Sequence, residues 1–183
     1  MKYYGAKELA ESFRTVRKNT IAVATDIPED QYGFRPAKES RSVAESLVHI
    51  ATANRFQHKF HDVDRRNSFA GIDFASVVSE FRAEEKRPRT KGEILELLRT
   101  NGEKFAGWLE GLSEEFLGEQ VSLPPGQTPP SKSRFEMLLG AKEHEMHHRG
   151  QLMLVERLLG IVPHLTRERE ARMATSQAAP AKT

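Results

Sequence analysis

Apolar residues recur at every third or fourth position along most of this sequence, the spacing that places them on one face of an α-helix. No segment alternates apolar and polar residues as a half-buried β-strand does. The spacing predicts four long helices, over residues 6–26, 42–64, 91–110 and 133–160. We therefore expect an all-α protein, and four helices of this length are most simply arranged as a four-helix bundle.

Capping and helix-breaking residues support these limits. Pro28 ends the first helix, because the residue before a proline disfavours helical geometry. Gly160 ends the fourth, with Pro163 just beyond it. The expected start sites are Ser40 or Ser42 for the second helix, Thr90 or Lys91 for the third, and Ser131 or Ser133 for the fourth.

The connections divide the chain into one domain and a tail. Residues 65–90 are mostly polar and predict a long crossover with one short amphipathic helix, Phe74–Phe81. A short helical turn at 113–117 precedes residues 123–130, whose four prolines require an extended loop. From residue 167 the sequence is charged and then rich in Ala, Ser and Pro. We expect a bundle domain over residues 1–166 and a flexible C-terminal tail over residues 167–183.

Composition excludes several classes of function. The chain has no cysteine, so disulfides, thiolate metal ligands and a cysteine nucleophile are excluded. The formal net charge is only +2, and basic residues alternate with acids, as in residues 82–87. We interpret such runs as solvated helix surface, and we expect no nucleic-acid partner. No stretch has the length of a membrane span, and the first residues lack the apolar core of a signal peptide, so we expect a cytoplasmic protein with no membrane partner.

The run His-Glu-Met-His-His at residues 144–148 indicates a metal site. His144 and His148 are four residues apart, so a helix places both imidazoles on one face, one turn apart. With Glu145 they also complete the pattern H-E-x-x-H that zinc peptidases use.

Helical angles select the histidines that face the bundle interior. At about 100° per residue, His144 and His148 lie within roughly 40° of Ala141 and Leu152 on the apolar stripe. His147 falls on the flank of that stripe. On the second helix His49 lies on the same face as the apolar residues Ala53, Phe56 and Phe60, so it also faces inward. His49, His144 and His148 therefore converge if the second and fourth helices are neighbours. The remaining histidines are expected outside this set, His58 and His61 on the surface and His164 in a loop.

Two interpretations of the three inward histidines stay open. They can be core residues satisfied by hydrogen bonds, or they can share a divalent transition metal such as Zn²⁺, Ni²⁺ or Fe²⁺. Three protein ligands would leave an open position of the kind found in catalytic sites. Glu145 lies at the edge of the stripe. Its carboxylate either orients a metal ligand or contacts metal-bound water, or it lies at the edge of the site and pairs with Lys142 or Arg149.

The chain resembles the DinB/YfiT-like metalloprotein superfamily. The resemblance covers roughly residues 6–163 and rests on the segment around His49 and on the H-x-x-x-H-R-G-Q run that starts at His144. It implies a four-helix bundle of up-down-down-up order, with one metal ligand on the second helix and two on the fourth, which map to His49, His144 and His148. The family often carries an aromatic residue where this chain has Arg41.

The same resemblance suggests what the protein does. Relatives include thiol-dependent S-transferases and isomerases that use low-molecular-weight thiols, and others are only described as metal-dependent hydrolases. Many relatives pair through their helices, so the resemblance also implies a homodimer. We expect a metal-dependent enzyme that acts on a small molecule, with a low-molecular-weight thiol as a candidate cofactor and Glu145 as the candidate catalytic residue. Two alternatives are a non-catalytic, stress-associated metal-binding bundle and a zinc peptidase that uses His144, Glu145 and His148.

Overall fold

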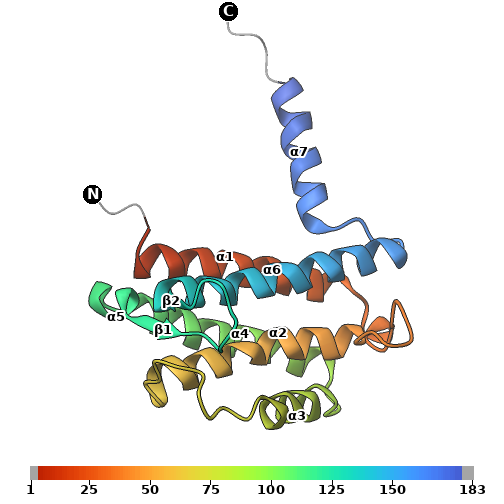
Figure 1. Ribbon diagram of the computed structural model, residues 1–183. Helices are drawn as coiled ribbons and strands as arrows, with labels where there is room; N and C mark the ends of the chain where they lie inside the picture. The colour runs from red at the N-terminus through yellow and green to blue at the C-terminus, as the bar shows by residue number, and fades with distance from the viewer. Residues whose placement is uncertain (1–3, 179–183) are drawn as a thin grey trace, which may run out of the picture.

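Four long helices form a bundle in the computed structural model, which describes residues 4–178 (Figure 1). They are α1 (Ala6–Asp26), α2 (Val43–His58), α4 (Lys91–Glu110) and α6 (Arg134–Leu158). The prediction of an all-α bundle is thus confirmed. The side chains of Ser42, Thr90 and Ser133 accept hydrogen bonds at the starts of α2, α4 and α6, and in each case a glutamate three residues later closes a capping box.

The helices run up, down, down and up. Lys91, at the start of α4, donates to carbonyl oxygens of Thr25 and Ile27 at the end of α1, so α1 and α4 are antiparallel. Arg134, at the start of α6, contacts His61 just beyond α2, so α2 and α6 are antiparallel as well. Helices α1 and α2 each pack against both α4 and α6. The second and fourth long helices are therefore neighbours, as convergence of the histidines requires.

Shorter elements complete the fold. A 3₁₀ turn (Glu29–Gln31) follows α1, a π-helical turn (Lys59–Val63) extends α2, and α3 (Phe74–Glu85) lies on the outer side of α2 in the long crossover (Figure 1). Helix α5 (Glu114–Gly118) precedes a pair of antiparallel strands, β1 (Gln120–Ser122) and β2 (Ser131–Ser133). These strands were not predicted, because three residues are too few to show an alternating pattern. No helix among the described residues is long and apolar enough to cross a membrane.

The C-terminal segment is helical over most of the predicted tail. Residues His164–Ala178 form helix α7, which stands away from the bundle in Figure 1. The predicted tail begins within this helix, and residues 179–183 lie outside the described part of the chain. His164, predicted as a loop residue, is the first residue of α7 and is buried.

A buried polar layer separates two apolar clusters in the bundle. One cluster gathers around Val23 and Leu47, and the other around Phe13 and Phe105. Between them lies Arg17, which is 4% exposed and reaches α2, α4 and α6 with its guanidinium group.

Gly102 on α4 makes room for this arginine. A Cβ at Gly102 would lie 2.8 Å from Cγ and 2.9 Å from Nη1 of Arg17, whose hydrogen bonds hold it in place. We expect Gly102→Ala to destabilise the fold by about 1–3 kcal/mol in urea unfolding, because the side chain overpacks the layer. Gly107→Ala in the same helix is the matched control, since nothing lies within 4 Å of its Cβ. There, better helix propensity should stabilise the protein by roughly 0.5–1 kcal/mol, and equal effects at both sites would contradict the steric argument.

Glu156 on α6 makes stability depend on pH. It is fully buried, neither carboxylate oxygen has a hydrogen-bond partner among the described residues, and burial raises its pKa to about 7. Between its unfolded pKa near 4.5 and about 7 the folded state binds more protons, so stability falls as pH rises through this window. We expect Glu156→Gln to be more stable than the wild type by about 1–3 kcal/mol at pH 8 and nearly equal at pH 4.5, measured by urea unfolding. Glu170→Gln, at an exposed position, should show no such pH dependence.

Candidate metal centre

Three imidazoles from two helices meet at one point beside the polar layer. His49 comes from the middle of α2, and His144 and His148 come from successive turns of α6. The Nε2 atom of His144 lies 3.1 Å from Nε2 of His49 and 3.2 Å from Nε2 of His148. The candidate ligand atoms all lie within 4.8 Å of one another. The structure thus brings together the three histidines that the helical angles selected.

This spacing fits a shared metal ion. Bonds of about 2.0–2.1 Å from one metal to imidazole nitrogens would place cis nitrogens roughly 2.9–3.4 Å apart in tetrahedral or octahedral geometry. The two short Nε2···Nε2 distances fall inside that range. The cluster forms because α2 and α6 both direct imidazole nitrogens toward the same point.

Hydrogen bonds on the outer side of two rings fix where their protons lie. Nδ1 of His49 is 2.7 Å from Oε1 of Glu85, and Nδ1 of His148 is 2.9 Å from Oε1 of Gln151. Both oxygens only accept, so each Nδ1 carries the proton and each Nε2 presents a lone pair. These two lone pairs face Nε2 of His144, which has at most one proton to offer. A cation at the centre would satisfy all three nitrogens.

The electrostatics favour the protonation states that metal binding needs. Burial, and then the neighbouring His148 and His49, lower the pKa of His144 to about 4. Burial likewise lowers the pKa of His148. Burial alone would raise the pKa of Glu85, but hydrogen bonds from His49 and Arg41 bring it below its ordinary value. At neutral pH His144 and His148 are therefore neutral and Glu85 is ionised.

The other histidines of the sequence analysis lie outside this group. His147 is exposed, and its Nε2 lies 3.1 Å from the Gln151 amide nitrogen. His58 is partly exposed beside Trp108, in agreement with a surface position. His61 was predicted on the surface and is fully buried against Arg134. That prediction was wrong because it assumed a continuous α-helix. The π-helical turn at Lys59–Val63 has a different angle per residue, so the side chain of His61 points in another direction.

Glu145 has a partner that the sequence did not suggest. Its carboxylate is 2% exposed and accepts hydrogen bonds from Nε and Nη2 of Arg17, both at 2.9 Å. Lys142 and Arg149 on the same helix were the expected ion-pair partners, but the residue that pairs with Glu145 is Arg17 of α1.

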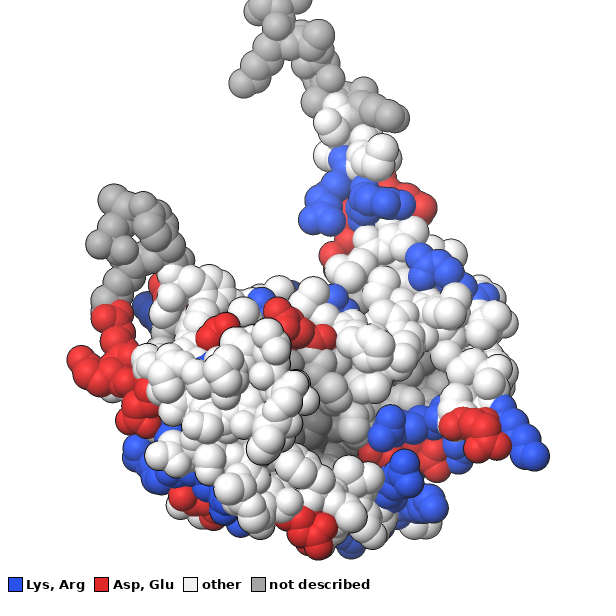
Figure 2. Space-filling view, in the orientation of Figure 1, with Lys and Arg blue, Asp and Glu red and all other residues white. Residues whose placement is uncertain are grey.

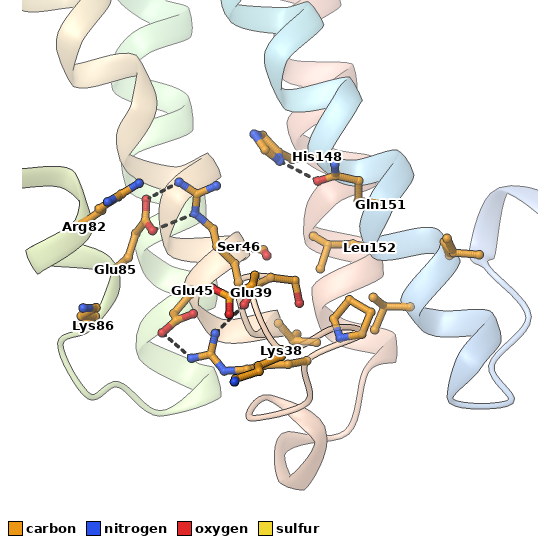
Figure 3. A pocket seen from close by; sticks show the side chains of 17 residues that line it. Lys38, Glu39, Glu45, Ser46, Arg82, Glu85, Lys86, His148, Gln151 and Leu152 are labelled. Atoms are coloured by element: carbon orange, nitrogen blue, oxygen red, sulfur yellow. Dashed lines mark hydrogen bonds and ion pairs between the residues drawn. The ribbon is translucent and has the colours of Figure 1, made fainter. Parts of the chain in front are cut away.

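A cavity of about 760 Å³ opens beside the three histidines, lined by His148 and Gln151 of α6, by residues 35–46 and by the end of α3. Figure 3 shows His148, Gln151 and Leu152 on one wall, with Arg82, Glu85 and Lys86 on the other. In Figure 2 the face is hollowed on its right-hand side, and charged side chains of both signs gather along the lower edge of the hollow. Volumes of this size are typical of small-molecule sites.

Comparison with known proteins agrees with the fold. The family model described as the DinB superfamily matches residues 12–152. The chain belongs to the DinB superfamily. It is 30% identical over 158 residues to the uncharacterised protein YjoA of Bacillus subtilis, covering 85% of this chain and 91% of YjoA.

Three solved structures share the fold of this DinB protein. The crystal structure of the DinB-like protein YjoA superposes with a TM-score of 0.59 at 29% identity, covering 84% of this chain and 92% of YjoA. YfiT of Bacillus subtilis, described as "a probable metal-dependent hydrolase with an unusual four-helix bundle topology", gives a TM-score of 0.66 at 13% identity, with 88% and 91% coverage. An uncharacterised protein of Clostridium difficile 630 gives 0.67 at 14% identity, with 86% and 98% coverage. At such low identity the last two support the fold of this DinB protein only.

Two residues beside the histidine cluster of this DinB protein were not predicted as site residues from the sequence. Glu85 and Arg41 form a chain of contacts to His49, with Arg41 donating to both carboxylate oxygens of Glu85 at 2.8 and 3.2 Å. Glu85 belongs to the charged run 82–87 that we interpreted as solvated surface, yet it is only 7% exposed. Arg41 stands where the family often has an aromatic residue, and this ion pair gives the departure a structural role.

We expect Glu85→Gln to weaken metal binding about 10–100-fold, because the carboxylate orients His49 and makes its imidazole a stronger donor. Competition with a chelating dye would measure the affinity. Glu84→Gln is the matched control, since Glu84 is its neighbour on α3 and pairs with Arg89 at 2.6 Å instead of a histidine. Equal losses in the two variants would show that charge near the site, not the contact with His49, sets the affinity.

Proposed function

We propose that this protein is a metal-dependent enzyme that acts on a small molecule, with His49, His144 and His148 as the metal ligands. The observation that carries the proposal is the convergence of three Nε2 atoms, two of which present lone pairs because Glu85 and Gln151 hold their Nδ1 protons. Three neutral nitrogen ligands suit Zn²⁺, Ni²⁺ or Fe²⁺. Such a set leaves coordination positions free, as catalytic sites do.

The reaction is hydrolysis or thiol-dependent transfer. A bound divalent metal supplies Lewis acidity, which lowers the pKa of a water or of a thiol that it contacts. Glu85 and Gln151 keep two of the ligand rings in the required orientation and tautomer. The cavity beside His148 has the volume of a small-molecule site. Hydrolysis is our first candidate, because a structural relative is described as a probable metal-dependent hydrolase. Thiol-dependent S-transfer is the second, supported by the same open ligand set.

Elemental analysis together with an activity screen tests the proposal. Protein purified without a metal-affinity tag should contain about one transition metal per chain. The screen should pair ester and amide hydrolysis with conjugation of electrophiles to glutathione, coenzyme A, bacillithiol and mycothiol, each with and without a chelator. Chelator-sensitive turnover in either arm supports an enzyme. Metal that stabilises the fold with no turnover in any arm would favour the non-catalytic bundle instead.

The arrangement gives little support to a zinc peptidase. Such a peptidase needs the glutamate of H-E-x-x-H to be free as a general base, and Arg17 engages both oxygens of Glu145 in a buried pair. The described residues contain only the three-residue strands β1 and β2, which pair with each other.

We propose further that the protein forms a homodimer through α6 and α7. Large apolar side chains lie exposed there, at Leu158, Val162 and Met173. Sedimentation equilibrium tests this, and a mass of one 20.7 kDa chain at micromolar concentration would count against it.

A further inference from the structure

The lining of the cavity beside His148 carries more positive than negative charge. Its ionisable side chains, apart from His148, are five cationic ones against three carboxylates, so two positive charges are in excess. The cations are Arg35, Lys38, Arg41, Arg82 and Lys86.

Ion pairs within the lining neutralise only part of this charge. Arg35 pairs with Glu45 at 2.7 Å, and Arg41 pairs with Glu85 at 2.8 Å. Lys38, Arg82 and Lys86 make no ion pair or side-chain hydrogen bond with any residue that the structure describes, and all three are exposed. Glu39 is a free carboxylate in the described lining, on the loop next to Lys38. On the α3 wall, where Glu85 is already paired with Arg41, Arg82 and Lys86 therefore leave two unpaired positive charges among the described residues.

Arg82 and Lys86 are arranged to act together. They are four residues apart near the end of α3, so both side chains leave the helix on the same face. In Figure 3 they stand beside Glu85, across the cavity from His148 and Gln151. A molecule held by these cations would span the cavity toward the imidazole cluster.

The opposite wall, on α6, is apolar beyond His148 and Gln151. Leu152, Leu154 and Val155 of α6 line it, and Leu154 is 60% exposed although it is a large apolar residue. The cavity thus faces a cationic wall on α3 with a partly apolar wall on α6, and the second wall also carries the candidate metal ligand His148.

We infer that the cavity binds a small amphiphilic anion, whose carboxylate or phosphate is held by Arg82 and Lys86 and whose apolar portion lies against α6. This inference rests on the proposed function in that the bound molecule is the substrate of the metal centre. Arg82 and Lys86 are specificity residues: they select acidic molecules and position them, and they do not touch the metal ligands.

Calorimetric titration of the full-length protein tests the inference with simple probes. The anions are 4-phenylbutyrate and phenyl phosphate, which separate carboxylate from phosphate recognition, and 4-phenylbutyramide is the neutral comparison. Each probe is titrated into zinc-loaded and into chelator-treated protein, because an anion can also bind zinc directly. The test variant is Arg82→Gln/Lys86→Gln. The control is Lys18→Gln/Lys104→Gln, which removes the same charge at exposed positions outside the cavity lining.

We expect at least one anion to bind the wild type about tenfold or more tightly than the neutral amide. The test variant should lose about tenfold or more of that affinity in both metal states, while the control keeps it, and added salt should weaken anion binding. Equal binding of the amide, equal affinity in test and control variants, or no anion binding at millimolar concentration would each overturn the inference. Binding of Zn²⁺, Ni²⁺ and Fe²⁺ is measured on the same protein: protein that binds anions but none of these metals would refute the proposed function and leave the anion site standing.

Discussion

His144→Ala is expected to abolish metal binding at micromolar metal concentrations. His144 is the central candidate ligand of the cluster, because its Nε2 lies within 3.2 Å of both other Nε2 atoms. Removing it leaves two imidazoles, and the loss should exceed the roughly 100-fold that even an outer hydrogen-bond partner can cost. Zn²⁺ at about 100 times its dissociation constant should stabilise the wild type by about 2.7 kcal/mol and should not stabilise the variant. Elemental analysis and thermal unfolding with and without Zn²⁺ provide the two measurements.

His147→Ala is the matched control for this prediction. His147 lies on the same helix, next to His148, but it is exposed and outside the group of candidate ligands. It should retain full metal occupancy and the full stabilisation by Zn²⁺. Full occupancy in His144→Ala, or a loss of the same size in His147→Ala, would mean that the ligand set is misassigned.

The long helices and the histidine cluster could be predicted because both depend on local periodicity. The predicted end of the first helix before Pro28 and the predicted start of the third long helix at Thr90 agree with the structure, because such boundaries depend on neighbouring residues only. Angles on two helical wheels were enough to select His49, His144 and His148. Whether these wheels faced each other depended on the topology, which the family resemblance suggested and the structure confirms.

The partners of the cluster could not be predicted because they depend on packing between distant segments. Glu85 reaches His49 because the crossover helix α3 packs against α2. The alternating charges around Glu85 in the sequence are typical of solvated surface and gave no sign of this contact. His61 is buried because of a π-helical turn that no residue pattern announced. Arg17 pairs with Glu145 across 128 positions of sequence. No spacing rule connects residues so far apart.

The buried pair of Arg17 and Glu145 gives the second large expected effect. Both side chains are at most 4% exposed. We expect Glu145→Gln to destabilise the metal-free protein by about 3–5 kcal/mol, because it leaves the guanidinium charge of Arg17 buried without its counter-ion. Urea unfolding in the presence of a chelator measures this. The matched control is Glu103→Gln, which breaks the exposed ion pair with Arg14 and should cost about 0–1 kcal/mol. A cost below about 1 kcal/mol for Glu145→Gln would show that the buried charge is compensated in another way.

Replacing both members of the pair separates its effect on stability from its effect on the site. Arg17→Met/Glu145→Leu removes both buried charges, and apolar replacement of a buried ion pair often restores stability. Arg17 also donates to the carbonyl of Ile50 at 3.3 Å, one residue after His49, while Glu145 directly follows His144. The pair therefore ties the ligand-bearing turns of α2 and α6 together. We expect the double variant to unfold less readily than Glu145→Gln and yet to bind Zn²⁺ about tenfold more weakly than the wild type, since the ligands lose a support that holds them in register. Wild-type metal affinity in a stable double variant would reduce the pair to a structural role alone.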